Sequence, residues 1–219
     1  MMRTIAVIAL KGGSGKTTVA THLALAAHLR GLKTLVADID PQQSAVEVLQ
    51  AREREGPEYI ATSGADLYAA KFAAIRSQKD AMIIDTAAGA IEDLGHAIVL
   101  ADLSLLIVRP TLLDLAAAVR TANIVQRLKK PVMAVMNQAP VPRDGIEAPT
   151  VQRALRALKM MRLPLVPTIL RSRAIYQTAL ETGRSAEERG DEAAIREIVA
   201  LWAFIERFTF ARREAPIDG

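Results

Sequence analysis

Residues 11–18 read Lys11-Gly12-Gly13-Ser14-Gly15-Lys16-Thr17-Thr18, and they follow the apolar run Ile5–Leu10 directly. An apolar run, a glycine-rich turn and a helical stretch in this order predict a strand, a loop and a helix N-terminus. Such a loop points several backbone N–H groups into one concavity, where the helix dipole adds positive potential. Its glycines let the backbone approach an anion without a Cβ in the way. The stretch therefore predicts a phosphate-binding loop.

Lys16 and Thr17 extend this prediction from a phosphate to a nucleoside triphosphate. In loops of this kind the lysine reaches the β- and γ-phosphates, and the hydroxyl after it binds Mg²⁺. The alternative is a glycine-rich turn that carries two surface lysines. That alternative leaves unexplained why strand, lysine, hydroxyl and helix all fall in the required order.

The loop departs from the standard pattern G-x-x-x-x-G-K-[ST], because Leu10 stands where the first glycine is expected. The form K-G-G-x-G-K-T-T resembles the deviant Walker A box of the ParA/MinD family. This resemblance implies that residues 11–18 bind ATP with Mg²⁺ in a P-loop NTPase fold. It also implies that Lys11 crosses a dimer interface to the phosphates of the partner's ATP, as a catalytic residue alongside Lys16.

Length and composition favour one large α/β domain. The chain has 219 residues, 51% of them hydrophobic, and no cysteine, so disulfides and thiolate metal sites are excluded. A cysteine-free chain whose first strand begins almost at once fits a cytoplasmic protein without a signal peptide. The longest apolar stretch, Ala97–Val108, is too short to span a bilayer.

Apolar runs alternate with amphipathic runs along the whole chain. The expected strands are Thr4–Leu10, Thr34–Ile39, Ala81–Asp85, Leu103–Val108, Val132–Met136 and Leu165–Ile169. The expected helices are Lys16–Arg30, Gln43–Glu55, Leu67–Gln78, Leu113–Leu128, Ala148–Met161 and Asp191–Phe208. This alternation predicts a doubly wound, mainly parallel sheet with helices on both faces. We expect residues 1–219 to form a single ATPase domain without an N-terminal helix-turn-helix domain.

The second expected strand ends in the sequence Asp38-Ile39-Asp40-Pro41-Gln42. The carboxyl edge of a parallel sheet carries the ligand site, so both aspartates should lie beside the phosphate loop, on the same side of the strand. One carboxylate could orient an attacking water while the other holds Mg²⁺ through water. A solvated strand end with a proline turn is the alternative. The pattern resembles the second acidic box of the ParA family, which implies that Asp40 is catalytic.

The run Met82-Ile83-Ile84-Asp85 is typical of a Walker B strand, which ends in an aspartate that supports Mg²⁺. The expected metal set is therefore Thr17, Asp38, Asp40 and Asp85, mostly through water. ParA proteins often continue with two prolines, whereas this chain continues Thr86-Ala87-Ala88-Gly89. The small ParF-like (type Ib) partition proteins also have small residues here, and the chain resembles them in this respect.

Later segments resemble the same family. Asn137 stands where related ATPases contact adenine, although it could instead be a buried or capping side chain. The stretch Pro167–Glu187, including Arg171, Arg173, Tyr176 and Gly183, resembles in its spacing the loop that borders the base in ParF-like proteins. The segment Arg109–Leu115 resembles a loop at the family's dimer face, although it could equally be a strand-to-helix turn with Thr111 or Asp114 near the helix start.

Basic residues gather between Arg120 and Arg173. Eleven lysines and arginines face two acidic residues there, a local excess of nine in a chain of net charge +4. Such a face favours sequence-independent, salt-sensitive DNA binding, although it could also be an ordinary solvated surface. The candidate DNA contacts are Arg153, Arg156, Lys159, Arg171 and Arg173.

The resemblance implies an ATPase that dimerises with ATP, binds nucleoid DNA non-specifically and is stimulated by a ParB-like or small centromere-binding protein. The alternatives are positioning of a protein cargo, MinD-like membrane association and a metabolic kinase. Spacing in 194–205 favours a helix packed on the sheet over a membrane anchor. The tail mixes phenylalanines with arginines, but Glu206 and the acidic ending Glu214–Asp218 make membrane binding the weaker expectation.

Overall fold

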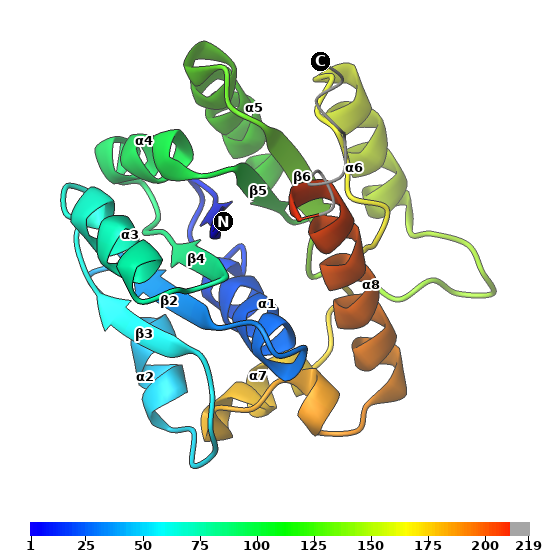
Figure 1. The fold of residues 1–219 in the computed structure, drawn as a ribbon. Coiled ribbons are helices and arrows are strands. Elements are labelled where there is room, and N and C mark those ends of the chain that lie inside the picture. Colours follow the sequence, from blue (N-terminus) through cyan, green and yellow to red (C-terminus); the bar gives the residue numbers. More distant parts are fainter. Residues whose placement is uncertain (211–219) are drawn as a thin grey trace, which may run out of the picture.

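The computed structural model describes residues 1–210, whose strands form one six-stranded parallel sheet (Figure 1). The strands are β1 (Arg3–Ile8), β2 (Thr34–Asp38), β3 (Glu58–Ala61), β4 (Ala81–Asp85), β5 (Leu103–Val108) and β6 (Val132–Met136). Their order is β3-β2-β4-β1-β5-β6, so β1 lies inside the sheet between β4 and β5. The loop that follows β1 therefore opens at the carboxyl edge, where parallel sheets bind ligands.

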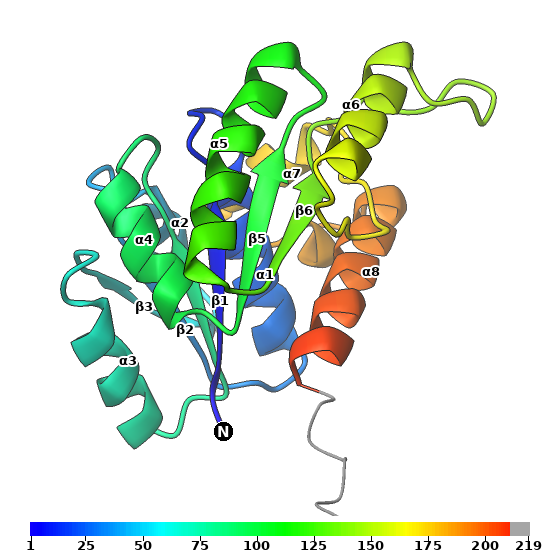
Figure 2. The ribbon, with the colours of Figure 1, turned by 90° about the horizontal axis from the view of Figure 1, so that it is seen from above.

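Helices cover both faces of this sheet, and Figure 2 shows the two layers. They are α1 (Lys16–Leu29), α2 (Ser44–Gln50), α3 (Leu67–Arg76), α4 (Ile91–Leu100), α5 (Leu112–Leu128), α6 (Pro149–Met160), α7 (Ile175–Thr178) and α8 (Glu192–Thr209), with short 3₁₀ turns η1 (Leu180–Thr182) and η2 (Ala186–Glu188). Residues of α1, α2 and α8 form one core, and residues of α3 to α6 form the other.

Strand side chains alternate between the two cores. Ile5 and Val7 of β1 pack in the first core, whereas Ala6 and Ile8 pack in the second. Since both faces are covered, a strand must be apolar at every position, and this explains the continuous apolar runs in the sequence. The doubly wound fold predicted from the sequence is confirmed.

The prediction of a strand at Leu165–Ile169 is wrong. This segment makes one isolated bridge, from Leu165 to Ala134 of β6, and a second isolated bridge lies beyond it, between Arg171 and Ala139. Proline has no N–H to donate to a ladder, and Pro164 and Pro167 interrupt the run on both sides of Val166.

The sequence did not predict β3, α4, the one-turn helix α7 or the 3₁₀ turns η1 and η2. The strand β3 is a four-residue, largely exposed edge strand, so it lacks the apolar pattern of the others. The helix α4 runs directly into the apolar residues of β5, which hides its end at Leu100. The helix α2 is shorter than expected, while the other helices agree within two residues at each end. Gly31 ends α1 in the left-handed conformation, and its N–H donates to the carbonyl oxygen of His28 at 2.8 Å.

The C-terminal helix α8 packs on the sheet as predicted. Its buried residues Ala194, Ile198, Trp202 and Ile205 belong to the first core. Helices that are both long and apolar enough to cross a membrane are absent from residues 1–210. Arg212, Arg213 and the acidic ending Glu214–Asp218 lie outside the described residues.

Candidate nucleotide site

The glycine-rich loop joins β1 to α1 and has the backbone conformation that its glycines allow. Gly13 and Gly15 have φ angles of 72° and 90°, in the left-handed region. A Cβ added at Gly15 would lie 2.4 Å from Nδ2 of Asn137, so only glycine fits there. The loop is therefore built around this contact, and α1 begins immediately after it at Lys16.

Asn137 fastens the loop to the end of β6. Its amide Nδ2 donates a 2.8 Å hydrogen bond to the carbonyl oxygen of Ser14, and Nε2 of Gln138 donates a 3.4 Å bond to that of Gly13. Asn137 is buried and also lines a cavity beside the loop. The Asn137 side chain is thus buried and hydrogen-bonded, as the alternative to an adenine contact predicted. A contact with adenine stays a prediction.

Two aspartates lie opposite each other at the carboxyl edge, since Asp38 of β2 pairs in register with Asp85 of β4. Both are fully buried. Neither carboxylate oxygen of Asp85 has a hydrogen-bond partner of good geometry among the described residues. Burial raises the pKa of Asp85 to about 7, while the nearby Thr17 hydroxyl and Lys16 ammonium act in the opposite direction.

The carboxylate of Asp38, in contrast, is satisfied by the backbone. Its Oδ1 accepts from the N–H of Asp40 at 3.0 Å, and its Oδ2 accepts from Ala45 at 2.9 Å and Val46 at 3.3 Å. Asp38 therefore holds the start of α2 against the sheet. Burial raises the pKa of Asp38, and these three bonds oppose the rise.

Asp40 lies in the turn after β2, because the strand ends at Asp38. The prediction that strand geometry places Asp38 and Asp40 on the same side is therefore wrong, because Asp40 is not in the strand. Asp40 is nevertheless close to the site, since its charge raises the pKa of Lys16. Its Oδ1 accepts from the N–H of Gln42 at 3.0 Å.

Lys16 is buried at the centre of this group, with 7% of its surface exposed. Burial lowers its pKa, while Asp85 and then Asp40 raise it. The fold thus brings together a lysine, a hydroxyl and unpaired carboxylate oxygens. Hydroxyl and carboxylate oxygens are donors that Mg²⁺ takes together with phosphate and water, so Thr17 and Asp85 fit a magnesium site.

A cavity of about 310 Å³ lies beside the loop. It is lined by Thr18, Asn137, Gln138, Arg171, Ser172, Arg173, Ala174, Tyr176 and Gln177. Its mixed lining and its place next to the phosphate loop suit a nucleoside. The predicted contact Pro167 is exposed and does not line this cavity. The wall is formed by Arg171–Gln177, which lie within the predicted stretch Pro167–Glu187.

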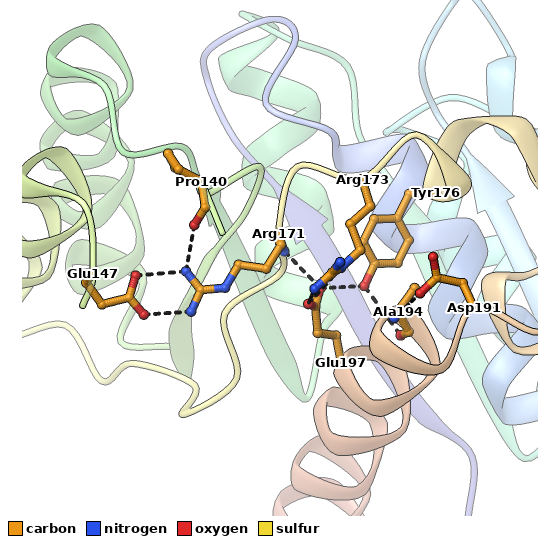
Figure 3. A network of polar contacts seen from close by, with 8 residues as sticks. All are labelled: Pro140, Glu147, Arg171, Arg173, Tyr176, Asp191, Ala194 and Glu197. Carbon is orange, nitrogen blue, oxygen red and sulfur yellow. Dashed lines mark hydrogen bonds and ion pairs between the residues drawn. The ribbon is translucent and has the colours of Figure 1, made fainter. Parts of the chain in front are cut away.

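The cavity wall is held by the ion-pair network of Figure 3. The guanidinium of Arg171 donates to both carboxylate oxygens of Glu147, at 2.8 and 2.6 Å, and to the carbonyl of Pro140 at 2.9 Å. Arg173 donates from Nε and Nη2 to Oε1 of Glu197 on α8, at 3.0 and 2.8 Å. These bonds lower the pKa of Glu147 and raise that of Arg173.

This network engages Arg171 and Arg173, two of the five candidate DNA contacts, so their contact with DNA stays a prediction. Both are paired with carboxylates and line the cavity. Glu197 is the residue that the sequence did not point to. It also accepts from the N–H of Arg171 at 2.9 Å and from the Tyr176 hydroxyl at 2.7 Å. A carboxylate so distant along the chain carries no local signal.

The remaining basic candidates lie on α6. Arg153, Arg156 and Lys159 are all exposed and recur every third residue along the helix, while Val151, Ala154 and Leu158 are buried. The predicted common face is therefore present. Contact of this face with DNA stays a prediction.

The loop surface around Lys11 is accessible. Lys11 is partly exposed, and Gly12 and Gly13 are exposed. Nη1 of Arg109 lies near Gly13, 3.6 Å from where a Cβ would stand. Asp114 holds the Arg109 guanidinium through two hydrogen bonds of 3.0 and 3.1 Å.

The segment after β5 has the turn that the sequence allowed as an alternative. The hydroxyl of Thr111 caps α5 by accepting from the N–H of Asp114 at 3.2 Å. Next to this cap, Leu112 and Leu113 are 81% and 65% exposed.

Comparisons with known proteins agree with this geometry. The family model described as the CobQ/CobB/MinD/ParA nucleotide binding domain matches residues 5–182. Maintenance of carboxysome distribution protein A from Halothiobacillus neapolitanus is 26% identical over 200 residues, which are 85% of this chain and 88% of that protein. The putative replication protein A of Rhizobium rhizogenes is 51% identical over only 43 residues, so the match spans 20% of this chain and 11% of that protein.

Solved structures share the fold over nearly the whole chain. Apo McdA from Cyanothece superposes with a TM-score of 0.78 at 19% identity, covering 94% of this chain and 100% of that one. The cell division ATPase MinD from Pyrococcus furiosus gives a TM-score of 0.76 at 22% identity, covering 95% and 100%. A plasmid partition protein from Borrelia burgdorferi, described as putative and bound to AMPPNP, gives a TM-score of 0.73 at 14% identity. The match covers 95% of this chain and 100% of that one.

Proposed function

Because the chain belongs to the CobQ/CobB/MinD/ParA nucleotide-binding family, we propose that it is a magnesium-dependent ATPase of the ParA type that distributes a large DNA cargo. The observation that carries the proposal is the placement of buried Lys16 at a phosphate-binding loop beside Asp85, whose carboxylate oxygens have no hydrogen-bond partner of good geometry in residues 1–210. Among the similar structures, McdA was solved with ATP and a MinD from Pyrococcus horikoshii with Mg-ADP.

The loop and its neighbours divide the work of hydrolysis. The N–H groups of residues 12–18 and the Lys16 ammonium bind the phosphates, and Thr17 and Asp85 hold Mg²⁺. When bound, Mg²⁺ neutralises charge on the phosphate oxygens. Asp40 orients the attacking water. Asp38 acts through the backbone of this region, because its own oxygens are engaged.

ATP-dependent dimerisation follows from the exposed side of the loop. Lys11 reaches from one subunit to the phosphates bound by the other, so hydrolysis needs two copies. The apolar side chains of Leu112 and Leu113, exposed near the same sheet edge, supply contact area for such a pair. A bound nucleotide would then switch the chain between monomer and dimer.

DNA binding belongs to the α6 face in this proposal. Arg153, Arg156 and Lys159 project three cations without aromatic side chains between them, which suits phosphate contacts rather than base recognition. A dimer doubles this face and strengthens its attraction to nucleoid DNA in the cytoplasm. A ParB-like or small centromere-binding partner would stimulate hydrolysis and release the DNA.

A protein cargo is the second candidate. The relative that aligns over 200 residues is a carboxysome distribution protein, whereas the match to a replication protein spans 43 residues. The same nucleotide cycle and DNA face would serve either cargo, so only the partner differs.

The test combines nucleotide binding, hydrolysis and dimerisation. We expect Lys16→Ala to lose ATP and ADP binding, and Lys11→Ala to keep ADP binding but lose ATP-dependent dimerisation and hydrolysis. Lys33→Ala, at an exposed lysine away from the loop, is the control. Normal dimerisation and turnover by Lys11→Ala would refute the role of Lys11. Normal nucleotide binding by Lys16→Ala would refute the site itself.

A further inference from the structure

The helices α3 and α4 lie side by side on one face of the sheet (Figures 1 and 2). Each also has exposed apolar side chains. On α3, Tyr68, Phe72 and Ile75 are 76%, 60% and 51% exposed. On α4, Ile91 and Val99 are 60% and 51% exposed. The spacing of both sets, three or four residues or a multiple, places each on one side of its helix. Two apolar stripes therefore face solvent together.

Between these stripes the surface is hollow. One cavity of about 340 Å³ contacts Tyr68, Ile91 and Val99, and a second of about 360 Å³ contacts Tyr68, Phe72 and Val99. Because they share lining residues, the two form one elongated depression. We call it the α3–α4 groove, defined by Tyr68, Phe72, Ile75, Ile91, Gly95 and Val99.

Gly95 forms part of the groove lining although it lies in the middle of α4. Glycine at such a position costs about 1 kcal/mol relative to alanine. A Cβ at Gly95 would meet no heavy atom within 4 Å, so the packing within residues 1–210 does not require a glycine there. The missing side chain deepens the groove and leaves room for the close approach of another element.

Charge marks one end of the groove. Lys71 and Lys130 line the second cavity, and the Lys71 ammonium donates one hydrogen bond of 2.8 Å to the carbonyl oxygen of Leu100. Burial lowers the pKa of Lys71, Asp102 raises it, and Lys130 lowers it further. Asp102 also lines this end, but its carboxylate accepts from the N–H of Thr4 at 2.7 Å and pairs with Arg3. At the other end the groove is lined by Glu92. A ligand that carries carboxylates toward the two lysines therefore complements the groove.

We propose that the α3–α4 groove docks an amphipathic helix of a partner protein, with acidic residues at the end that faces Lys71 and Lys130. A helix laid between two helices buries an apolar stripe of its own against both. A second copy of this chain fits less well, because it would place a groove on a groove and leave both hollows unfilled. The groove does not include residues 11–18 of the phosphate loop. The proposal therefore holds whether the ATPase distributes DNA or a protein.

The probe is a pair of fluorescein-labelled helical peptides of about 18 residues with apolar residues at i, i+3, i+4 and i+7. One peptide carries three glutamates at one end, and the other carries three lysines there. Fluorescence anisotropy with the full chain should show that the acidic peptide binds at least about tenfold more tightly. Lys130→Glu should remove this preference. Equal binding of both peptides would overturn the proposal.

Variants of the groove separate specific docking from general stickiness. Phe72→Glu and Gly95→Leu should each lower the affinity for the acidic peptide by about tenfold or more. The first places a charge, and the second a large side chain, where the peptide helix lies. Met160→Glu, at an 85% exposed position on α6, is the matched control and should leave binding unchanged. Wild-type affinity in Gly95→Leu would contradict the proposal, with unchanged ATPase activity confirming that the variant folds.

The other possible occupants give different results. A concentration-dependent dimer without nucleotide that Val99→Glu abolishes would assign the groove to a second copy. Tighter peptide binding after removal of residues 211–219 would assign it to that segment. Either outcome would overturn the proposal that a partner helix occupies the groove.

Discussion

Asp38 and Asp85 lie opposite each other in register on neighbouring strands, yet only one of the two carboxylates is satisfied within the protein. Asp38 accepts three backbone hydrogen bonds, whereas neither oxygen of Asp85 has a hydrogen-bond partner of good geometry among the described residues. Burial alone therefore does not distinguish their roles. The first carboxylate shapes the site, and the second is available to what the site binds.

Substitution should separate these two roles. We expect Asp38→Asn to lower the free energy of unfolding by about 2–4 kcal/mol, because an amide nitrogen would face backbone N–H groups. Asp85→Asn should leave the stability of the nucleotide-free protein equal or higher, since it removes a buried charge, but it should abolish magnesium-dependent hydrolysis. Urea unfolding and steady-state ATPase assays measure the two effects. Greater destabilisation by Asp85→Asn than by Asp38→Asn would contradict this assignment.

Glu197 should control nucleotide affinity without touching the phosphate loop. Its carboxylate orders Arg173, Tyr176 and the backbone of Arg171 at the cavity wall. We expect Glu197→Gln to weaken ATP and ADP binding alike by about three- to tenfold, because charge-assisted bonds become neutral ones. The control is Glu192→Gln on the same helix, whose carboxylate is 86% exposed and pairs only with Arg196 in the described residues. Titration calorimetry that finds equal affinities for both variants would exclude this role.

DNA binding should depend on α6 and not directly on the paired arginines. We expect Arg153→Glu combined with Arg156→Glu to weaken DNA binding by the ATP-bound protein and to lower the salt slope by about 2. Arg196→Glu on α8, at a 71% exposed side chain, is the control for charge reversal outside α6. The measurement is DNA affinity at several salt concentrations. An unchanged salt dependence of the DNA affinity would show that the α6 face does not bind DNA.

Arg173→Glu should also reduce DNA retention, but for another reason. Reversal of this charge breaks the pair with Glu197 and disorders the cavity wall, so ATP affinity should fall first. Loss of DNA binding at saturating ATP with normal ATP affinity would instead make Arg173 a DNA contact.

His22 should make the protein sensitive to acid. It is buried in α1 against Tyr176, neither ring nitrogen has a hydrogen-bond partner within the described part of the chain, and burial lowers its pKa to about 4. In the unfolded chain the His22 imidazole is protonated below about pH 6.5, whereas in the folded chain it stays neutral down to about pH 4. The free energy of unfolding therefore falls as the pH falls from about 6.5 toward 4.

The matching variant is His22→Leu, which removes this titration. Relative to it, the wild type should lose about 2 kcal/mol of unfolding free energy from about pH 7.5 to about pH 5. His96→Gln, at an exposed histidine, is the control. Parallel stability curves for wild type and His22→Leu would show that the buried ring is not the sensor.

The order of chemical groups along the chain was sufficient to predict the phosphate loop, the Walker B aspartate and the parallel sheet. Each is a local pattern: glycines next to a lysine and a hydroxyl, or apolar residues that end in a carboxylate. In a parallel sheet such strand ends must meet at one edge, so Lys16, Asp40 and Asp85 could be placed together before any coordinates were known. Lys11 stood out in the same way, as an extra cation at the start of the loop.

Only the tertiary structure decided which polar groups are satisfied and by what. Arg171 and Arg173 count as cations in the sequence, but Glu147 and Glu197 pair with them from distant segments. The sequence left Asn137 as either a base contact or a buried side chain, and the structure shows that its amide holds the loop backbone. The exposed α3–α4 groove likewise depends on how two helices lie together. Local patterns determine the chemistry that a segment offers, whereas the partners of a charge depend on contacts between segments that the linear sequence does not encode locally.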